Sequence, residues 1–181
     1  MTPKELLDSV LTRFQVVYLG QPALDVLLAQ ALGVYQDKAG PVKTLALATD
    51  AESAVIPGDF LGVAVVLDAE GRWHEVNMTE TDLVVTVQRR KSRKPFKIWY
   101  FVHMRGMNST TGVLPEESVS ILFDYLYVLI AIPNTQRATE VAAATGMQIQ
   151  LPGDGELDQR KAILEESMED CRSIIPMATV Y

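Results

Sequence analysis

The longest apolar run of the chain lies between Leu114 and Pro133. On a period of 3.6 residues it presents two adjoining apolar faces, and only a narrow stripe that includes Ser120 and Asp124 is less apolar. A buried strand is the competing interpretation, but about 14 uninterrupted residues exceed the usual strand length of about 5 to 6. A helix that is apolar on nearly all sides must be surrounded by other elements. The pattern therefore predicts a buried central helix.

The two ends of this helix carry local signals. Pro115 suits the first helical turn, and Glu116 and Glu117 place negative charge at the positive end of the helix dipole. Pro133 and Asn134 are expected to end this element and to start another short helix, which Gly146 closes. The apolar run is shorter than the roughly 20 residues that span a bilayer. It also contains Asp124, so we expect no membrane segment.

A second helical region lies at the beginning of the chain. Thr2, Pro3 and Glu5 form a capping-box pattern with proline at the first helical position. Apolar residues at helical spacing then continue to Tyr18. A second helix is expected from Pro22 until Gly40 and Pro41 stop it.

Between residues 42 and 104 the apolar pattern changes to that of strands. Residues 60–67 form a continuous β-prone run, and residues 73–76 are its expected hairpin partner. Residues 83–87 and 96–102 are expected to form a second hairpin. The pattern predicts an antiparallel sheet of roughly four or five strands, inserted between helical segments.

The last helix is expected near residues 154–173, with Asp154 as its N-cap, an apolar stripe that includes Leu157 and Met168, and a strongly acidic outer face. We therefore predict an α+β chain. It has a helical bundle of about four to five helices in residues 1–41 and 113–175, an inserted antiparallel β subdomain in residues 42–104, and a C-terminal docking tail in residues 174–181.

Composition supports one well-packed globular protein. The chain has 181 residues, of which 48% are hydrophobic, and its net charge of −7 argues against a general nucleic-acid binder. The first residues lack a basic and then apolar signal pattern, so synthesis in the cytoplasm is expected. The single cysteine, Cys171, excludes an internal disulfide, and its helical spacing predicts a packed thiol.

Positive charge is concentrated in one segment. Six of the 16 Lys and Arg residues lie between residues 89 and 97, so the remainder has ten basic and 23 acidic residues, a net charge of −13. This segment lies at the expected tip of the second hairpin, where it could contact phosphates or the acidic surface of a neighbouring subunit, or protect a sheet edge from aggregation. Its charged members are Arg89, Arg90, Lys91, Arg93, Lys94 and Lys97.

The sequence shows no catalytic signature. No nucleophile elbow, Walker A, dinucleotide-binding or zincin pattern occurs, and neither His74 nor His103 has metal-ligand spacing to a Cys or carboxylate. We therefore expect no enzyme activity, no metal and no cofactor. Asp124 is either solvent-facing or paired with an arginine of this chain or of a neighbour.

The uncharged C-terminal tail either folds back onto the core or adds as a strand to the sheet of a partner. Its candidate partner-binding residues are Ile174, Ile175, Pro176, Met177, Val180 and Tyr181.

The order of elements resembles the head-to-tail connector (adaptor) proteins of tailed bacteriophages. The matching parts are the helix pair of residues 3–39, the antiparallel insertion, the helix after Leu114-Pro115-Glu116, the acidic last helix and the short tail. The likeness is one of element order over nearly the whole chain, without a residue signature.

The resemblance implies a structural role in the neck of a virion. Subunits of that family form rings, usually dodecameric, that sit beneath the portal, extend the DNA channel and present a platform for tail proteins. It implies that residues 174–181 contact the portal and that residues 89–97 face a neighbouring subunit, a tail protein or the DNA, which passes without sequence-specific contact. The alternative from the residues themselves is a nucleic-acid-binding module that uses the basic segment. A small enzyme with an unrecognised site is a third hypothesis.

Overall fold

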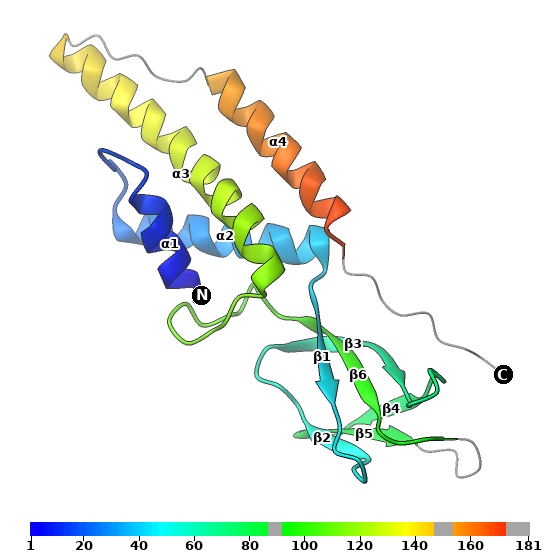
Figure 1. The fold of residues 1–181 in the computed structure, drawn as a ribbon. Helices are drawn as coiled ribbons and strands as arrows, with labels where there is room; N and C mark the ends of the chain where they lie inside the picture. Colours follow the sequence, from blue (N-terminus) through cyan, green and yellow to red (C-terminus); the bar gives the residue numbers. More distant parts are fainter. Residues whose placement is uncertain (87–91, 147–153, 173–181) are drawn as a thin grey trace. The chain divides into compact units, whose positions relative to one another are not determined.

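The computed structural model describes residues 1–86, 92–146 and 154–172 (Figure 1). Within these residues the protein has four helices and two small antiparallel sheets, so the predicted α+β class is confirmed. The helices are α1 (Pro3–Leu11), α2 (Gln21–Ala39), α3 (Glu116–Thr145) and α4 (Asp154–Asp170). The strands are β1 (Val42–Ala46), β2 (Ser53–Val55), β3 (Phe60–Leu67), β4 (Glu75–Met78), β5 (Asp82–Thr86) and β6 (Lys97–Val102).

The described residues form two compact units. We call residues 1–39 and 104–172 the helical unit, and residues 40–103 the β unit. The helical unit is thus built from both sides of the insertion, and the chain leaves it after α2 and returns to it before α3.

The first helix begins as the sequence predicted and ends earlier. The Thr2 hydroxyl accepts a hydrogen bond from the Glu5 N–H, and the Glu5 carboxylate accepts one from the Thr2 N–H, which completes the capping box. The expectation that this helix continues to Tyr18 was wrong, because α1 ends at Leu11. The backbone of the following loop is hydrogen-bonded to α3 instead, through Asn134 and Arg137.

The central helix is longer than predicted. Pro133 does not end it, because α3 continues without interruption for 30 residues to a left-handed C-cap at Gly146, with φ of 69°. Pro115 occupies the N-cap rather than the first helical position. A proline inside a helix costs about 3 kcal/mol. Packing of the second half of α3, where Ala138 and Ala142 are buried, offsets this cost. Contacts with α1, α2 and α4 surround α3.

By length and hydropathy α3 is the one described helix that could span a membrane. However, 56% of its most apolar window is buried within the structure. Its fully buried side chains include Leu122, Tyr125, Leu126 and Ile130. This burial is that of a core helix in a folded unit, as the apolar pattern predicted.

The β unit contains two three-stranded sheets, in the orders β1-β6-β3 and β2-β5-β4. The first predicted hairpin is present only at its turn, where Leu67 bridges Trp73 and the His74 N–H donates to the Val66 carbonyl; strand β4 then pairs with β5. The second predicted hairpin was wrong. Strand β6 pairs with β1 and β3 rather than with β5.

The two sheets enclose one core. Its buried members are Leu47, Val66, Leu83, Val85, Phe96 and Ile98. Strands β5 and β6 lie in different sheets, and the apolar side chains of both sheets meet in this core. Burial of apolar side chains therefore determined which strands pair, and the order of the strands along the chain did not indicate these pairs.

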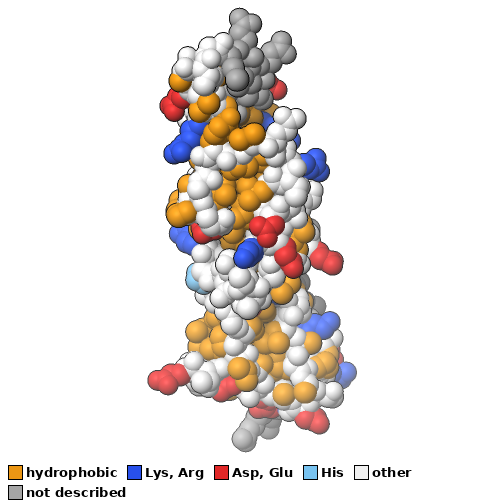
Figure 2. Space-filling view, turned by 90° about the vertical axis from the view of Figure 1, so that its left-hand side faces the viewer, with side chains coloured by type: hydrophobic (Ala, Val, Ile, Leu, Met, Phe, Trp, Pro, Cys, Tyr) orange, Lys and Arg blue, Asp and Glu red, His pale blue; other side chains and the backbone are white. Residues whose placement is uncertain are grey.

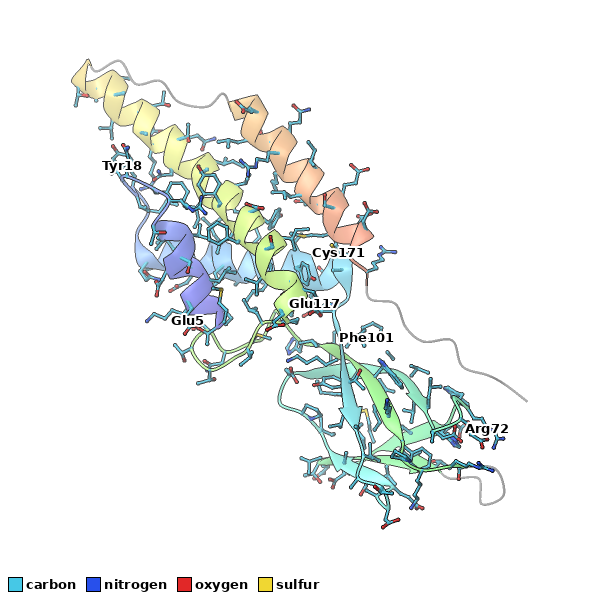
Figure 3. The ribbon with its side chains drawn as sticks, in the orientation of Figure 1. Glu5, Tyr18, Arg72, Phe101, Glu117 and Cys171 are labelled. Atoms are coloured by element: carbon cyan, nitrogen blue, oxygen red, sulfur yellow. The ribbon has the colours of Figure 1, made fainter. Side chains whose placement is uncertain are left out.

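The last helix begins at Asp154, so this residue lies within the helix rather than at the predicted N-cap position. Leu157 and Met168 are buried, as the spacing predicted. Cys171 was expected to pack and is exposed instead, because the helix ends at Asp170 and leaves the thiol just beyond it (Figure 3).

Candidate interaction surfaces

The structure describes only the second half of the basic segment, residues 89–97. Arg89, Arg90 and Lys91 lie outside the described residues. Arg93 Nε is 2.7 Å from a Glu70 carboxylate oxygen, and Lys94 Nζ is 3.0 Å from one of Glu52. Two of the six positive charges are therefore matched by acidic residues of the same unit.

Asp68 anchors this half of the basic segment. Its side chain is fully buried, with 0% exposure. One carboxylate oxygen accepts hydrogen bonds of 2.9 Å from the N–H groups of Glu70 and Arg72, and the other accepts one of 3.0 Å from Arg93 N–H. The Ala69 N–H also donates to the Arg93 carbonyl. The turn after β3 thus fixes the position at which the basic segment rejoins the β unit.

The environment of Asp68 favours its charged form. Burial acts to raise the pKa of its carboxyl group, but the N–H groups of Arg72, Arg93 and Glu70 and the His74 side chain stabilise the carboxylate, and the net pKa is lowered. His74 Nε2 is 3.3 Å from the carboxylate but is not aligned for a hydrogen bond. The sequence predicted this turn but did not reveal the role of Asp68. The available signal was an aspartate directly after an apolar strand and three residues before Gly71.

Asp124 pairs with an arginine of the same chain. Arg160 on α4 places Nη2 3.8 Å from its carboxylate, and both side chains are about half-exposed. The Arg160 guanidinium also lies over the Tyr127 ring, and Phe14 stacks on that ring with centroids 4.9 Å apart. The polar stripe of α3 is therefore partly covered around Asp124 and Tyr127, by α4 and by the loop after α1, while Ser120 is exposed.

The inner edge of the acidic helix α4 is neutralised within the helical unit. Lys38 Nζ is 2.7 Å from Glu169 and 4.0 Å from Glu165, and Glu165 accepts a hydrogen bond of 2.7 Å from the Tyr125 hydroxyl. The hydrogen bond from Lys38 lowers the pKa of Glu169. These contacts lie on the side of α4 that faces α2 and α3.

The outer side of α4 carries carboxylates that pair with no described residue. Residues at positions i, i+3, i+7, i+10 and i+14 form one exposed stripe along the helix. We call Glu156, Gln159, Ile163, Glu166 and Asp170 the α4 stripe. Among the described residues, none forms an ion pair with its three carboxylates. The expected acidic outer face is therefore present.

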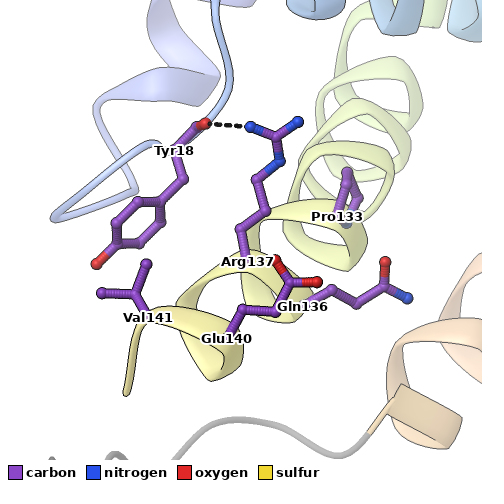
Figure 4. Close-up of a pocket in the computed structure, with 6 residues that line it drawn as sticks. All are labelled: Tyr18, Pro133, Gln136, Arg137, Glu140 and Val141. Carbon is purple, nitrogen blue, oxygen red and sulfur yellow. Dashed lines mark hydrogen bonds between the residues drawn. The ribbon is translucent and has the colours of Figure 1, made fainter. Parts of the chain in front are cut away.

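A groove of about 580 Å³ lies where the loop after α1 crosses α3 (Figure 4). The Arg137 guanidinium donates a hydrogen bond of 3.2 Å to the Tyr18 carbonyl along one side. The groove is lined by Tyr18, Pro133, Gln136, Arg137, Glu140 and Val141. These side chains offer one carboxylate, one guanidinium and the hydroxyl of Tyr18.

Apolar side chains reach the surface around this groove. Figure 2 shows hydrophobic side chains gathered on the surface of the helical unit. Val141, which lines the groove, is 43% exposed, and Val16, in the loop after α1, is 55% exposed. Exposed apolar groups of this kind are typical of surfaces that meet another protein.

Two predicted sites remain untested by the structure. The tail residues 174–181 lie outside the described residues, as does the first half of the basic segment. Within the described residues, no group of three or more His, Cys, Asp or Glu side chains is placed to hold a metal ion. No protein-family model and no curated protein matches the sequence.

Proposed function

We propose that this chain is a structural subunit of the head-to-tail connector ring of a tailed bacteriophage, where it joins the portal to the tail and extends the DNA channel. It acts by binding other proteins and catalyses no reaction. The observation that carries the proposal is the order of elements: a helical unit assembled from both sides of an inserted antiparallel β unit, followed by an acidic helix and a short uncharged segment. This order resembles that of the connector family.

The distribution of charge supports a role in protein assembly. Arg93 and Lys94 of the basic segment are matched by Glu70 and Glu52, whereas three carboxylates of the α4 stripe have no partner among the described residues. Unmatched acidic residues repel a polyanion but suit a cationic protein surface. The alternative function, nucleic-acid binding through residues 89–97, is thereby disfavoured.

The test is assembly with the cognate portal protein. We expect the full chain to form a ring-sized complex on the portal, as measured by native mass spectrometry and electron microscopy. Removal of residues 174–181 is expected to leave the circular dichroism spectrum and melting temperature unchanged and to abolish binding to the portal. Unaltered assembly of the truncated chain would contradict the role of the tail.

Two further measurements separate the alternatives. Neutralisation of the six basic residues between 89 and 97 should change DNA affinity little if the connector assignment is right, whereas a DNA-binding module would lose a steeply salt-dependent affinity. A chain that stays monomeric at high concentration, binds no virion protein and turns over a metabolite would exclude the connector function.

A further inference from the structure

One face of the β1-β6-β3 sheet points away from the core of the β unit. Side chains alternate along β6, and Ile98 belongs to the core cluster that the two sheets enclose. Lys97, Trp99 and Phe101 therefore lie on the opposite face. The strand register places Val65 beside Trp99 and Leu67 beside Lys97 on that same face.

Aromatic side chains reach the surface on this face. We call Lys97, Trp99 and Phe101 the sheet face; Lys97 is exposed, and Trp99 and Phe101 are half-buried. Val65 and Leu67 lie on the same side of the sheet but are buried, with 7% and 6% exposure, so they are not part of this surface. Lys97 is its one charge, and Trp73, which is 49% exposed, extends it through its bridge to Leu67. The solvent face of an antiparallel sheet commonly carries polar side chains. Tryptophan is enriched in the energetically dominant parts of protein interfaces, and both tryptophans of the chain lie here.

The α4 stripe has the complementary character. Ile163 is 53% exposed, and the carboxylates of Glu156, Glu166 and Asp170 flank it along the helix. The stripe thus offers an apolar residue within negative charge, while the sheet face offers aromatic residues beside the exposed Lys97. Opposite charges that surround apolar contacts favour association of the two surfaces and fix their register.

We propose that the sheet face of one subunit binds the α4 stripe of a second copy of this chain. The inference rests on the proposed function and identifies the two surfaces through which neighbouring subunits meet. Because the surfaces differ, the contact is head-to-tail. A head-to-tail contact generates a closed ring when its rotation closes, in contrast to the isologous contact of a two-fold dimer.

The experiment uses two charge-reversing substitutions in the full chain, Lys97→Glu and Glu166→Lys. Both side chains are exposed, so the fold is expected to stay intact, which circular dichroism and thermal unfolding check. Each variant alone should self-associate about tenfold more weakly than the wild type or worse, since like charges then meet across the contact. Light scattering and sedimentation over a concentration series measure the association, both alone and on the portal.

An equimolar mixture of the two variants provides the decisive measurement. In the mixture the substituted sheet face of one chain meets the substituted α4 stripe of the other, so opposite charges face each other again. The two unchanged surfaces, with Lys97 on one chain and Glu166 on the other, also match, so assembly should return. The double variant with both substitutions should assemble as well. Lys4→Glu and Glu80→Lys are matched controls, since both residues are exposed and lie outside the two surfaces, and they should leave assembly unchanged.

Single variants that assemble like the wild type, or a mixture that does not regain assembly, would overturn the proposed contact. The result is separate from the test of function. If the single variants form unaltered rings and bind the portal, the contact between the sheet face and the α4 stripe is excluded but the connector function is kept. A wild type that neither self-associates nor binds the portal would exclude both the contact and the function.

Discussion

Asn134 on α3 holds the backbone beside Tyr18 from 116 residues away in the sequence. Its side-chain oxygen accepts a hydrogen bond of 2.7 Å from the Tyr18 N–H, and its side-chain nitrogen donates one of 3.0 Å to the Val16 carbonyl. One amide thus satisfies a donor and an acceptor of the loop after α1. The loop forms one side of the groove, and Figure 3 shows Tyr18 on it next to α3.

Substitution Asn134→Ala should therefore loosen this loop. Two backbone groups lose their partners, so we expect the free energy of unfolding to fall by about 1 to 2 kcal/mol, the cost of unpaired and partly buried polar groups less a small gain in helix propensity. Chemical unfolding measures the change, and hydrogen exchange at the Tyr18 amide should become faster. Gln136→Ala is the matched control on the same helix, and an equal loss in both variants would contradict the role of Asn134.

Substitution Asp68→Asn should destabilise the β unit at neutral pH. An asparagine offers one acceptor oxygen where the carboxylate offers two, so at least one of the N–H groups of Glu70, Arg72 and Arg93 is left unpaired. We expect a loss of about 2 kcal/mol. Chemical unfolding at pH 7, followed by tryptophan fluorescence, measures it.

The wild type and the Asp68→Asn variant also test how the free energy of unfolding depends on pH. The folded-state pKa of Asp68 is below its ordinary value of 3.8, so its contribution is complete above that pH and is lost as the pH falls through the folded-state value. The difference between wild type and Asp68→Asn should therefore shrink below about pH 4. A difference that stays constant down to pH 2 would mean that the carboxylate charge is irrelevant to stability.

The hydroxyl of Tyr125 should contribute to the packing of α4. It donates a hydrogen bond of 2.7 Å to Glu165, and burial, followed by this hydrogen bond, raises the pKa of the tyrosine. Substitution Tyr125→Phe removes a hydrogen bond to a charged group, which costs about 1.5 to 3 kcal/mol. Tyr127→Phe is the control on the same helix and should change stability by less than about 0.5 kcal/mol. Calorimetry that finds equal effects would exclude a stabilising Tyr125 contact.

Substitution Gly112→Ala should strain the connection before α3. An added Cβ would lie 2.6 Å from the Asn108 carbonyl oxygen and would also overlap the Met107 side chain. The Gly112 N–H donates to that carbonyl, so the turn cannot open without losing this bond. We expect a loss of about 1 to 3 kcal/mol. Gly58→Ala meets nothing within 4 Å and should be tolerated, as thermal unfolding of both variants would show.

Local signals decided the parts of this protein that the sequence predicted well. The capping box of Thr2 and Glu5 acts within the first turn of α1. The left-handed cap of α3 depends on the single residue Gly146. The apolar faces of the central helix could be read directly because burial on all sides requires apolar residues on all sides. The mixture of helical and strand periods gave the α+β class for the same reason.

Contacts between distant residues decided the rest. The sequence alone did not show that Asn134 would hold the loop after Leu11, that α3 would continue beyond Pro133, or that Glu70 would pair with Arg93. Strand partners were also mispredicted, since several apolar strands have similar patterns and only the closing of two sheets around Phe96 and Ile98 selects among them. Sequence thus determined which residues are helical, extended or buried, whereas tertiary packing determined which of them meet, because pairing depends on free energy gained between segments far apart in the chain.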